Sequence, residues 1–257
     1  MRAVAIVQAR LGSTRLPGKV LLPLADRPVL FHVVDRLRAV PTLADVAVAT
    51  TDRPADERIR TWCREEGIPC FAGSEDDVLD RYYRAALKFG ADPVVRVTAD
   101  CPLIDPEIVG RALNLYASGQ GRLLYVGFDN SFPDGLDVEV IALAALQTAW
   151  REAHLVSERE HVTPFIWKHP ERFPQDRIRN YRDLSDQRWT VDEPEDYQLI
   201  QSIYAALYQP GRPFGMAEVL DFLSAHPDLR SLNRGIVRNE GYLKSVRQDH
   251  VRAETKR

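Results

Sequence analysis

A basic, glycine-containing segment near the start of the chain carries the clearest chemical signal in the sequence. Residues 8–19 contain no acid and three cations, which are Arg10, Arg15 and Lys19. Arginine and lysine side chains bind phosphate oxygens through charge-assisted hydrogen bonds, and glycines let the backbone approach a ligand closely. We therefore predict that these three side chains bind a triphosphate and stabilise charge during its reaction. A solvated basic turn is the alternative.

The spacing in this segment does not fit either of the two common nucleotide-binding loops. A Walker A loop has four residues between its glycines and a hydroxyl residue after its lysine. Here five residues separate Gly12 from Gly18, and Val20 follows the lysine. Pro17 also lacks a backbone N–H that such a loop donates. The dinucleotide-binding pattern G-x-G-x-x-G is missing as well, so the segment is a phosphate loop of another kind.

Two aspartates that follow short apolar runs are candidate ligands for a metal ion. Asp100 comes after the run 93–98, and Asp192 comes after the run 188–191. Ligands of α/β proteins bind beyond the carboxyl ends of parallel strands, where both carboxylates can flank one cation. Carboxylate oxygens suit Mg²⁺ when phosphates supply further oxygens. A turn or a helix cap is the alternative for each aspartate.

Four more polar residues are candidates for binding a second substrate. Asp137 and Glu139 are two apart in a predicted strand, so both side chains lie on one face and can hold sugar hydroxyls. Glu160 and His161 lie on a predicted helix, where the imidazole can act as a base or contact a substrate. The alternatives are a solvated strand face for the acids and a surface or hydrogen-bonded histidine.

Strand and helix signals alternate through the first half of the chain, and this order must position the candidate residues. The expected strands share short, mostly apolar runs and cover residues 3–7, 46–50, 68–71, 93–98 and 123–127. Helices are expected between them, and they begin near Pro28, Pro54, Asp76 and Asp105. The order predicts an α/β fold with a mostly parallel sheet flanked by helices on both faces.

The second half of the chain departs from this alternation. We interpret residues 128–187 as an α+β segment inserted beside the sheet, after which the chain returns to the core at Trp189. A helix is expected at 194–208, and residues 210–257 are expected to form a helical tail that frays over its last dozen residues. A chain of 257 residues suits a single domain with such an insertion.

Composition argues against several classes of protein. The net charge is −3, and no long stretch interleaves basic residues with aromatics, so we expect no nucleic-acid partner. No apolar run approaches the roughly 18 residues of a membrane span, and the N-terminus lacks the pattern of a secretory signal. Three cysteines without disulfide-type or zinc-type spacing indicate reduced thiols. We therefore expect a cytoplasmic protein.

Several segments, in their order along the chain, resemble those of the cytidylyltransferases that activate acidic sugars. That family includes the CMP-KDO and CMP-acylneuraminate synthetases, and the resemblance is strongest to its spore coat polysaccharide biosynthesis protein F branch. The matching segments carry short motifs of acids, glycines and arginines and are residues 8–19, 76–82, 97–105, 134–139, 159–164, 190–196 and 238–242.

This resemblance implies the glycosyltransferase-A type fold of the nucleotide-diphosphosugar transferases and a homodimer formed through the inserted segment. It implies Mg²⁺ on Asp100 and Asp192, with Arg10 and Lys19 on the triphosphate of CTP. The residues expected to bind the nucleotide lie in the basic loop and at the strand ends, and they are Gln8, Ala9, Leu11, Gly12, Ser13, Gly73, Ser74, Asp77, Arg81, Thr98 and Ala99.

The implied reaction is the attack of a sugar hydroxyl on the α-phosphate of CTP, with loss of pyrophosphate. Such a transfer depends mainly on positioning and on charge stabilisation. The alternatives are a glycosyltransferase and a non-catalytic nucleotide-binding protein. Glycosyltransferases of this fold usually carry Asp-x-Asp at the strand end, where this chain has Asp100-Cys101-Pro102. A binding protein can dispense with both aspartates, which are present here.

Overall fold

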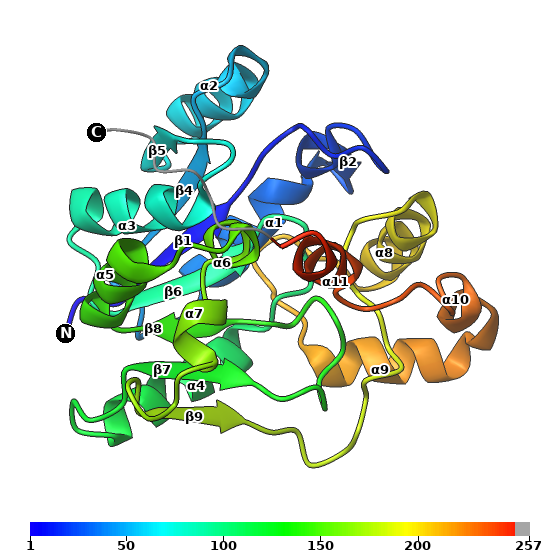
Figure 1. Ribbon diagram of the computed structural model, residues 1–257. Helices are drawn as coiled ribbons and strands as arrows, with labels where there is room; N and C mark the ends of the chain where they lie inside the picture. Colours follow the sequence, from blue (N-terminus) through cyan, green and yellow to red (C-terminus); the bar gives the residue numbers. More distant parts are fainter. Residues whose placement is uncertain (250–257) are drawn as a thin grey trace.

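A seven-stranded sheet forms the centre of the computed structural model, which describes residues 1–249 (Figure 1). The strand order is β5-β4-β1-β6-β8-β7-β9. The first half of the sheet is parallel and consists of β1 (Val4–Gln8), β4 (Asp45–Thr51), β5 (Cys70–Gly73) and β6 (Val94–Thr98). The other half consists of β7 (Tyr125–Phe128), β8 (Glu139–Ile141) and β9 (Gln175–Ile178). Strand β8 runs antiparallel to both of its neighbours.

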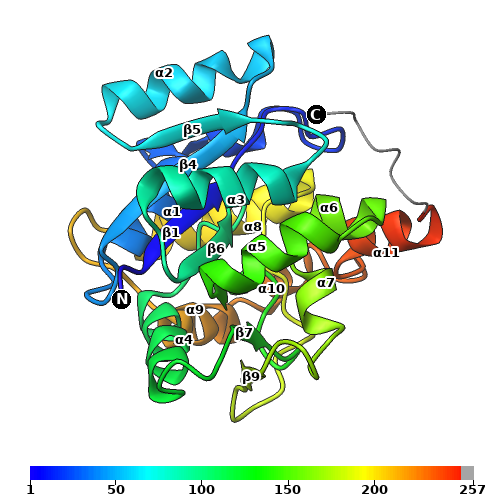
Figure 2. The ribbon, with the colours of Figure 1, turned by 60° about the vertical axis from the view of Figure 1, so that its left-hand side comes forward.

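Helices cover both faces of this sheet (Figure 2). One face carries Ala5 and Val7 of β1 and is covered by α1 (Val29–Arg38), α2 (Glu57–Glu65), α4 (Pro106–Ser118), α8 (Pro194–Leu207) and α9 (Met216–Ala225). The other face carries Val4 and Ile6 and is covered by α3 (Val78–Phe89), α5 (Leu143–Glu152), α6 (Val156–His161) and α7 (Pro164–Trp167). Neighbouring residues of a strand point to opposite faces, so β1 contributes to both cores. The predicted α/β class is confirmed.

The remaining elements are short. They are the 3₁₀ turns η1 (Lys19–Leu21) and η2 (Pro54–Asp56), the hairpin strands β2 (Pro23–Leu24) and β3 (Arg27–Pro28), and the helices α10 (Pro227–Ser231) and α11 (Glu240–Arg247). The sequence analysis did not expect the hairpin. The tail is helical as expected, but its predicted fraying falls mainly on residues 250–257, which lie outside the described residues. Within residues 1–249, no helix has the length and apolar character needed to cross a bilayer.

Helix boundaries follow local signals that are readable in the sequence. The Asp105 carboxylate accepts a hydrogen bond from the Glu107 N–H (2.9 Å) at the start of α4, and Pro106 follows it. The Asp77 carboxylate caps α3 in the same way. Gly90 ends α3 with φ of +61°, a left-handed conformation that costs glycine little. The caps at Asp77 and Asp105 fix where α3 and α4 begin, and Gly90 fixes where α3 ends.

Residues 128–187 lie only partly beside the sheet, because α5, α6 and α7 cover one face while two strands of the segment belong to the sheet itself. The segment supplies β8, which lies between β6 and β7, and β9, which forms the sheet edge. The strand predicted around Asp137 and Glu139 is present over Glu139–Ile141, but no local pattern indicated its place between β6 and β7. Residues 188–191 form only one isolated bridge, between Arg188 and Asp134, rather than the expected strand. The role of this segment in a dimer stays a prediction.

The backbone at Gly135 packs closely against the backbone of Trp189 and Thr190, shortly before Asp192. Its φ is +103°, and an added Cβ would lie 2.6 Å from the Trp189 carbonyl carbon. We expect Gly135→Ala to lower the free energy of unfolding by about 3 kcal/mol or more, because backbone strain and overpacking act together. Gly211→Ala is the control, since Gly211 also has a positive φ of +76° but faces open space. Urea unfolding measures both, and equal losses would contradict the close approach.

Candidate active site

Asp100 and Asp192 converge on the ammonium group of Lys19. Lys19 Nζ lies 2.6 Å from Asp100 Oδ2 and 2.5 Å from Asp192 Oδ1. Asp100 follows β6, while Lys19 begins η1 after the loop that leaves β1. The Val191 N–H bonds to the Asp100 carbonyl oxygen (2.8 Å) and holds the second carboxylate beside the first. The structure thus joins three residues that lie far apart in the sequence.

Backbone geometry holds the basic loop in position. Gly18 precedes η1 with φ of +71°, and its N–H bonds to the Leu11 carbonyl oxygen (3.1 Å). The Leu11 N–H in turn donates to the Asp56 carboxylate (2.7 Å), which also accepts a hydrogen bond from the Thr51 hydroxyl. Asp56 is buried and was not among the predicted site residues. Its position just after β4 was the available signal, because polar groups at strand ends face this edge.

The charges of this centre stabilise one another against burial. Burial alone would lower the pKa of Lys19, but the carboxylates of Asp100 and Asp192 raise it above its ordinary value. Burial alone would raise the pKa of Asp100, but the Lys19 ammonium lowers it to about 2. The pairing of the Lys19 ammonium with these carboxylates therefore keeps the charges of Lys19 and Asp100 in a buried position.

The donor set of this centre suits a divalent cation. Both carboxylates reach a single cationic atom at about 2.5 Å, so both can face one ion. Carboxylate oxygens are the ligands that Mg²⁺ prefers, together with water and phosphate oxygens. Across residues 1–249, no group of three or more metal-type side chains gathers. An ion held by Asp100 and Asp192 would therefore complete its coordination with oxygens of substrate or water.

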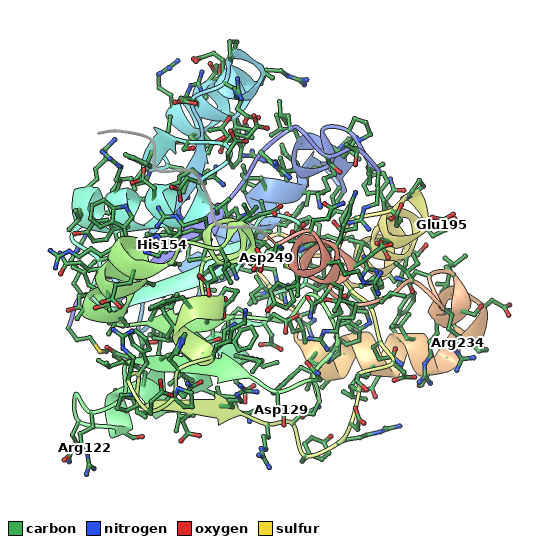
Figure 3. The ribbon with its side chains drawn as sticks, in the orientation of Figure 1. Arg122, Asp129, His154, Glu195, Arg234 and Asp249 are labelled. Carbon is green, nitrogen blue, oxygen red and sulfur yellow. The ribbon has the colours of Figure 1, made fainter. Side chains whose placement is uncertain are left out.

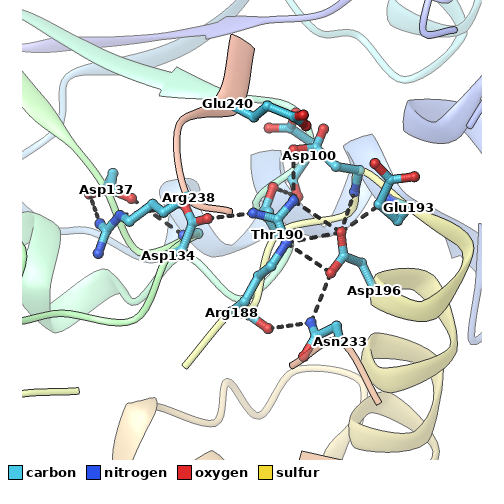
Figure 4. A network of polar contacts seen from close by, with 12 residues as sticks. Asp100, Asp134, Asp137, Arg188, Thr190, Glu193, Asp196, Asn233, Arg238 and Glu240 are labelled. Carbon is cyan, nitrogen blue, oxygen red and sulfur yellow. Dashed lines mark hydrogen bonds and ion pairs between the residues drawn. The ribbon is translucent and has the colours of Figure 1, made fainter. Parts of the chain in front are cut away.

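Behind this centre, the buried Arg188 arranges the acidic groups (Figure 4). Its guanidinium lies 2.6 Å from Asp134, 3.0 Å from Asp192 and 3.0 Å from Asp196. Asp196 also accepts a hydrogen bond from the Asp192 backbone N–H (3.1 Å) and one from the Asn233 amide (2.8 Å). The orientation of Asp192 is thus fixed from two sides. The sequence analysis named neither Arg188 nor Asp196 as a site residue.

The two predicted loop arginines have different partners. Arg15 lies 3.4 Å from Asp192 and 2.9 Å from Glu193, so it borders the centre. Arg10 pairs instead with Glu75 at 3.7 Å, and 46% of its side chain is exposed. An exposed arginine on a loop remains accessible to a large anionic ligand. The structure therefore brings Arg15 and Lys19 to the aspartates and leaves Arg10 at the rim of the loop.

The predicted nucleotide residues lie at the carboxyl ends of neighbouring strands. Gln8 ends β1 opposite Thr98, which ends β6, and Gly73 ends β5 on the other side. Ala9 and Ala99 follow directly and are joined by the Ala99 N–H to the Gln8 carbonyl oxygen (2.9 Å). Gln8 Oε1 is buried and makes no hydrogen bond with any residue in the described part of the chain. This acceptor is available to a ligand donor.

Some of these residues also stabilise the local structure of the loop and of the segment before α3. Ser13 bonds within the loop through its N–H and its hydroxyl. Arg81 is buried and donates to the Ser74 carbonyl oxygen (2.6 Å), which fixes the turn between β5 and α3. Asp77 caps α3 and pairs with Arg159 (2.6 Å). Their roles in nucleotide binding, like those of Leu11 and Gly12, stay predictions.

The four predicted substrate residues are not equivalent. Asp137 lies before β8 rather than in it, and 44% of its side chain is exposed. Glu139 pairs with Arg96 at 2.5 Å and has a side chain only 14% exposed, so a solvated strand face does not describe it. Glu160 and His161 both contact the Ser245 hydroxyl, which links them to α11. Burial lowers the pKa of His161, which favours the neutral imidazole.

Comparison with known proteins identifies the relatives of this arrangement. The family model described as cytidylyltransferase matches residues 4–216. The spore coat polysaccharide biosynthesis protein SpsF of Bacillus subtilis is 31% identical over 235 residues, which are 87% of this chain and 94% of that protein. The chain belongs to the cytidylyltransferase family. The expected family resemblance is therefore confirmed.

Two further relatives agree with this assignment. The solved structure of a cytidylyltransferase from Leptospira borgpetersenii has a TM-score of 0.86 and 32% identity, covering 92% of this chain and 99% of that one. The 3-deoxy-manno-octulosonate cytidylyltransferase of Trichlorobacter lovleyi is 36% identical over 123 residues, 47% of each chain. The first likeness extends over almost the whole fold, and the second covers about half of the chain.

The carboxyl group of Asp134 has a pKa well above its ordinary value. Burial and the charge of Asp137 raise the pKa of Asp134 to about 6, against the opposing pull of Arg188 and Arg238. Asp134 and Arg238 are two more residues that the sequence analysis did not name as site residues. Both lie in segments that carry the family resemblance, 134–139 and 238–242, and that placement was their signal.

The raised pKa of Asp134 predicts a pH dependence of folding. The folded protein binds a proton at Asp134 more tightly than the unfolded chain, where an aspartate has a pKa of about 3.9, so this group adds stability as pH falls. From about pH 7.5 to about pH 5 the gain is about 1 kcal/mol, and Asp134→Asn should lack it. Urea unfolding at both pH values tests this, with Asp221→Asn on the exposed side of α9 as the control. Identical pH profiles for the two variants would contradict it.

Proposed function

We propose that this protein transfers CMP from CTP to a sugar acid and releases pyrophosphate, in the synthesis of a surface or spore-coat polysaccharide. The observation that carries the proposal is the meeting of Lys19, Asp100 and Asp192 beside the basic loop. The names of the Bacillus and Trichlorobacter relatives support the polysaccharide and the sugar acid. We also propose a cytoplasmic homodimer that pairs through residues 128–187.

The residues of this centre have distinct tasks in such a transfer. Asp100 and Asp192 would hold Mg²⁺, which neutralises phosphate charge and orients oxygens when it is bound. The Lys19 ammonium lies between these carboxylates and beside the basic loop, where it can bind a phosphate oxygen. Arg15 stabilises charge from the α11 side, and Arg10 does so from the rim. Charge stabilisation of this kind supplies most of the rate in phosphoryl transfer.

The side of the site that we assign to the sugar has two carboxylates open to substrate hydroxyls, Asp137 and Glu160, each with a side chain that is 44% exposed. Glu139 is enclosed by Arg96 and by the Tyr125 hydroxyl, so it serves mainly to hold β6, β7 and β8 together. Asp137 is far more exposed and can accept hydroxyl hydrogen bonds. The neutral imidazole of His161 lies beside Ser245 and can contact the same substrate.

Removing the charge of Lys19 or Asp100 should slow the transfer of CMP strongly. We expect Lys19→Ala and Asp100→Ala each to lower the rate of pyrophosphate release by about 10²- to 10³-fold, because each loses a group that stabilises transition-state charge or positions the cation. The assay contains CTP, Mg²⁺ and a panel of 2-keto-3-deoxy sugar acids. Lys88→Ala, an exposed lysine at the end of α3, is the matched control. Near wild-type rates in both site variants would refute the proposal.

The base of the nucleotide is a separate question that binding alone can answer. We expect CTP with Mg²⁺ to raise the melting temperature more than ATP, GTP or UTP at equal concentration. At about 100 times its Kd, a ligand that binds only the folded state stabilises it by about 2.7 kcal/mol. Differential scanning fluorimetry measures this shift without any sugar. A larger shift with another triphosphate would replace CTP by that nucleotide.

A further inference from the structure

The C-terminal segment 238–247 crosses the sugar side of the site. In Figures 1 and 2, α11 lies beside α6, and the two helices are in contact. Three polar contacts join the segment to residues assigned above to a substrate: Arg238 to Asp137 (2.6 Å), Glu240 to Arg15 (3.4 Å) and Ser245 to Glu160 (2.7 Å). The segment therefore forms one wall of the site.

Arg238 is held in a way that leaves part of its guanidinium unused. Nη2 donates to Asp137, and Nη1 donates to the Phe132 carbonyl oxygen (2.9 Å). Nε is buried, lies 3.8 Å from Asp134 and makes no hydrogen bond with any residue from 1 to 249. An unmade hydrogen bond on a buried charged group is costly. The guanidinium thus has one free donor and one partner, Asp137, that is open to solvent.

Two neighbouring arginines, Arg96 and Arg159, pair with carboxylates that are largely buried. Arg96 pairs with Glu139, and the side chains are 17% and 14% exposed. Arg159 holds both carboxylate oxygens of Asp77 at 3.0 and 2.6 Å. Arg238 differs because its partner Asp137 is 44% exposed. An incoming anion can therefore reach this guanidinium and replace Asp137 without unpairing a buried acid.

The position of Arg238 suits an anionic group close to the reacting hydroxyl. Asp134 lies 3.8 Å from Arg238 and 2.6 Å from Arg188, and Arg188 lies 3.0 Å from Asp192 (Figure 4). In a 2-keto sugar acid, the carboxylate and the anomeric hydroxyl are attached to the same carbon atom. A hydroxyl that attacks beside Asp192 therefore brings its carboxylate into the region between that centre and the tail.

We propose that Arg238 binds the carboxylate of the sugar acid, which takes the place of Asp137 on the guanidinium. This inference rests on the proposed function and deepens it by naming the residue that selects an acidic substrate. The exchange gives Arg238 one carboxylate in place of another, so its guanidinium stays paired. Asp137 is then released to accept hydrogen bonds from sugar hydroxyls. A planar guanidinium binds a carboxylate through two parallel hydrogen bonds, which the free Nε donor makes available.

The test compares Arg238→Gln and Arg238→Lys with Arg234→Gln. Arg234 is an exposed arginine four residues before Arg238, at the outer edge of the molecule (Figure 3). Wild-type protein is first assayed for pyrophosphate release with CTP and a panel of 2-keto-3-deoxy sugar acids that includes 3-deoxy-manno-octulosonate and N-acetylneuraminate. The best acid is then compared with its neutral methyl ester, and KM and kcat are measured for sugar and for CTP.

We expect Arg238→Gln to raise KM for the sugar acid by about 10- to 100-fold while KM for CTP stays unchanged, since a charge-assisted hydrogen bond is lost. The preference for the acid over its ester should disappear in this variant, return in part in Arg238→Lys and persist in Arg234→Gln. A purely structural role would not alter that preference. An Arg238→Gln variant with the wild-type KM and the wild-type preference would overturn this inference alone. Wild-type protein that uses no acid of the panel would overturn the proposed function, and this inference with it.

Discussion

The pairing of one ammonium with two carboxylates is the interaction on which the rest of this site depends. Lys19 comes from the loop after β1, Asp100 from the end of β6 and Asp192 from the segment before α8. Parallel strands bring the first two to the same edge, and a backbone hydrogen bond from Val191 brings the third. Because burial opposes each charge, the three groups are stable at this position only together. The loop, the strand order and the start of α8 can therefore be understood as the means of keeping them in contact.

A second layer of charge keeps the first in place. Arg188 is buried among three aspartates, and Asn233 hydrogen-bonds both to the Arg188 carbonyl oxygen (2.9 Å) and to Asp196. A buried charge without partners is strongly destabilising, so removal of Arg188 would take from the buried Asp196 the cation that pairs with it. The arrangement gains little stability over an apolar core of the same volume. Its benefit is orientation, because it fixes the oxygens of Asp192.

Local sequence explains some of these features and not others. The basic loop, the strand-end position of Asp100 and the acid ahead of Pro194 are short-range patterns, and each indicated its place at the carboxyl edge. A strand was predicted around Glu139, but its place in the sheet was not, because the pairing of β8 with β6 is decided by contacts far along the chain. Arg188 looked like the first residue of a strand. Its function as a hub of ion pairs appears only when acids from three separate segments surround it.

The position of α11 links the completion of the site to the order of synthesis on the ribosome. The sheet and its helices come from earlier sequence, whereas the segment that contacts Arg15, Asp137 and His161 is made after them. All three residues of the Lys19–Asp100–Asp192 centre therefore precede this wall of the site in the order of synthesis. Loss of the contacts to Arg15, Asp137 and Glu160 would therefore open the site on that side and leave the ion-paired centre of Lys19, Asp100 and Asp192 intact.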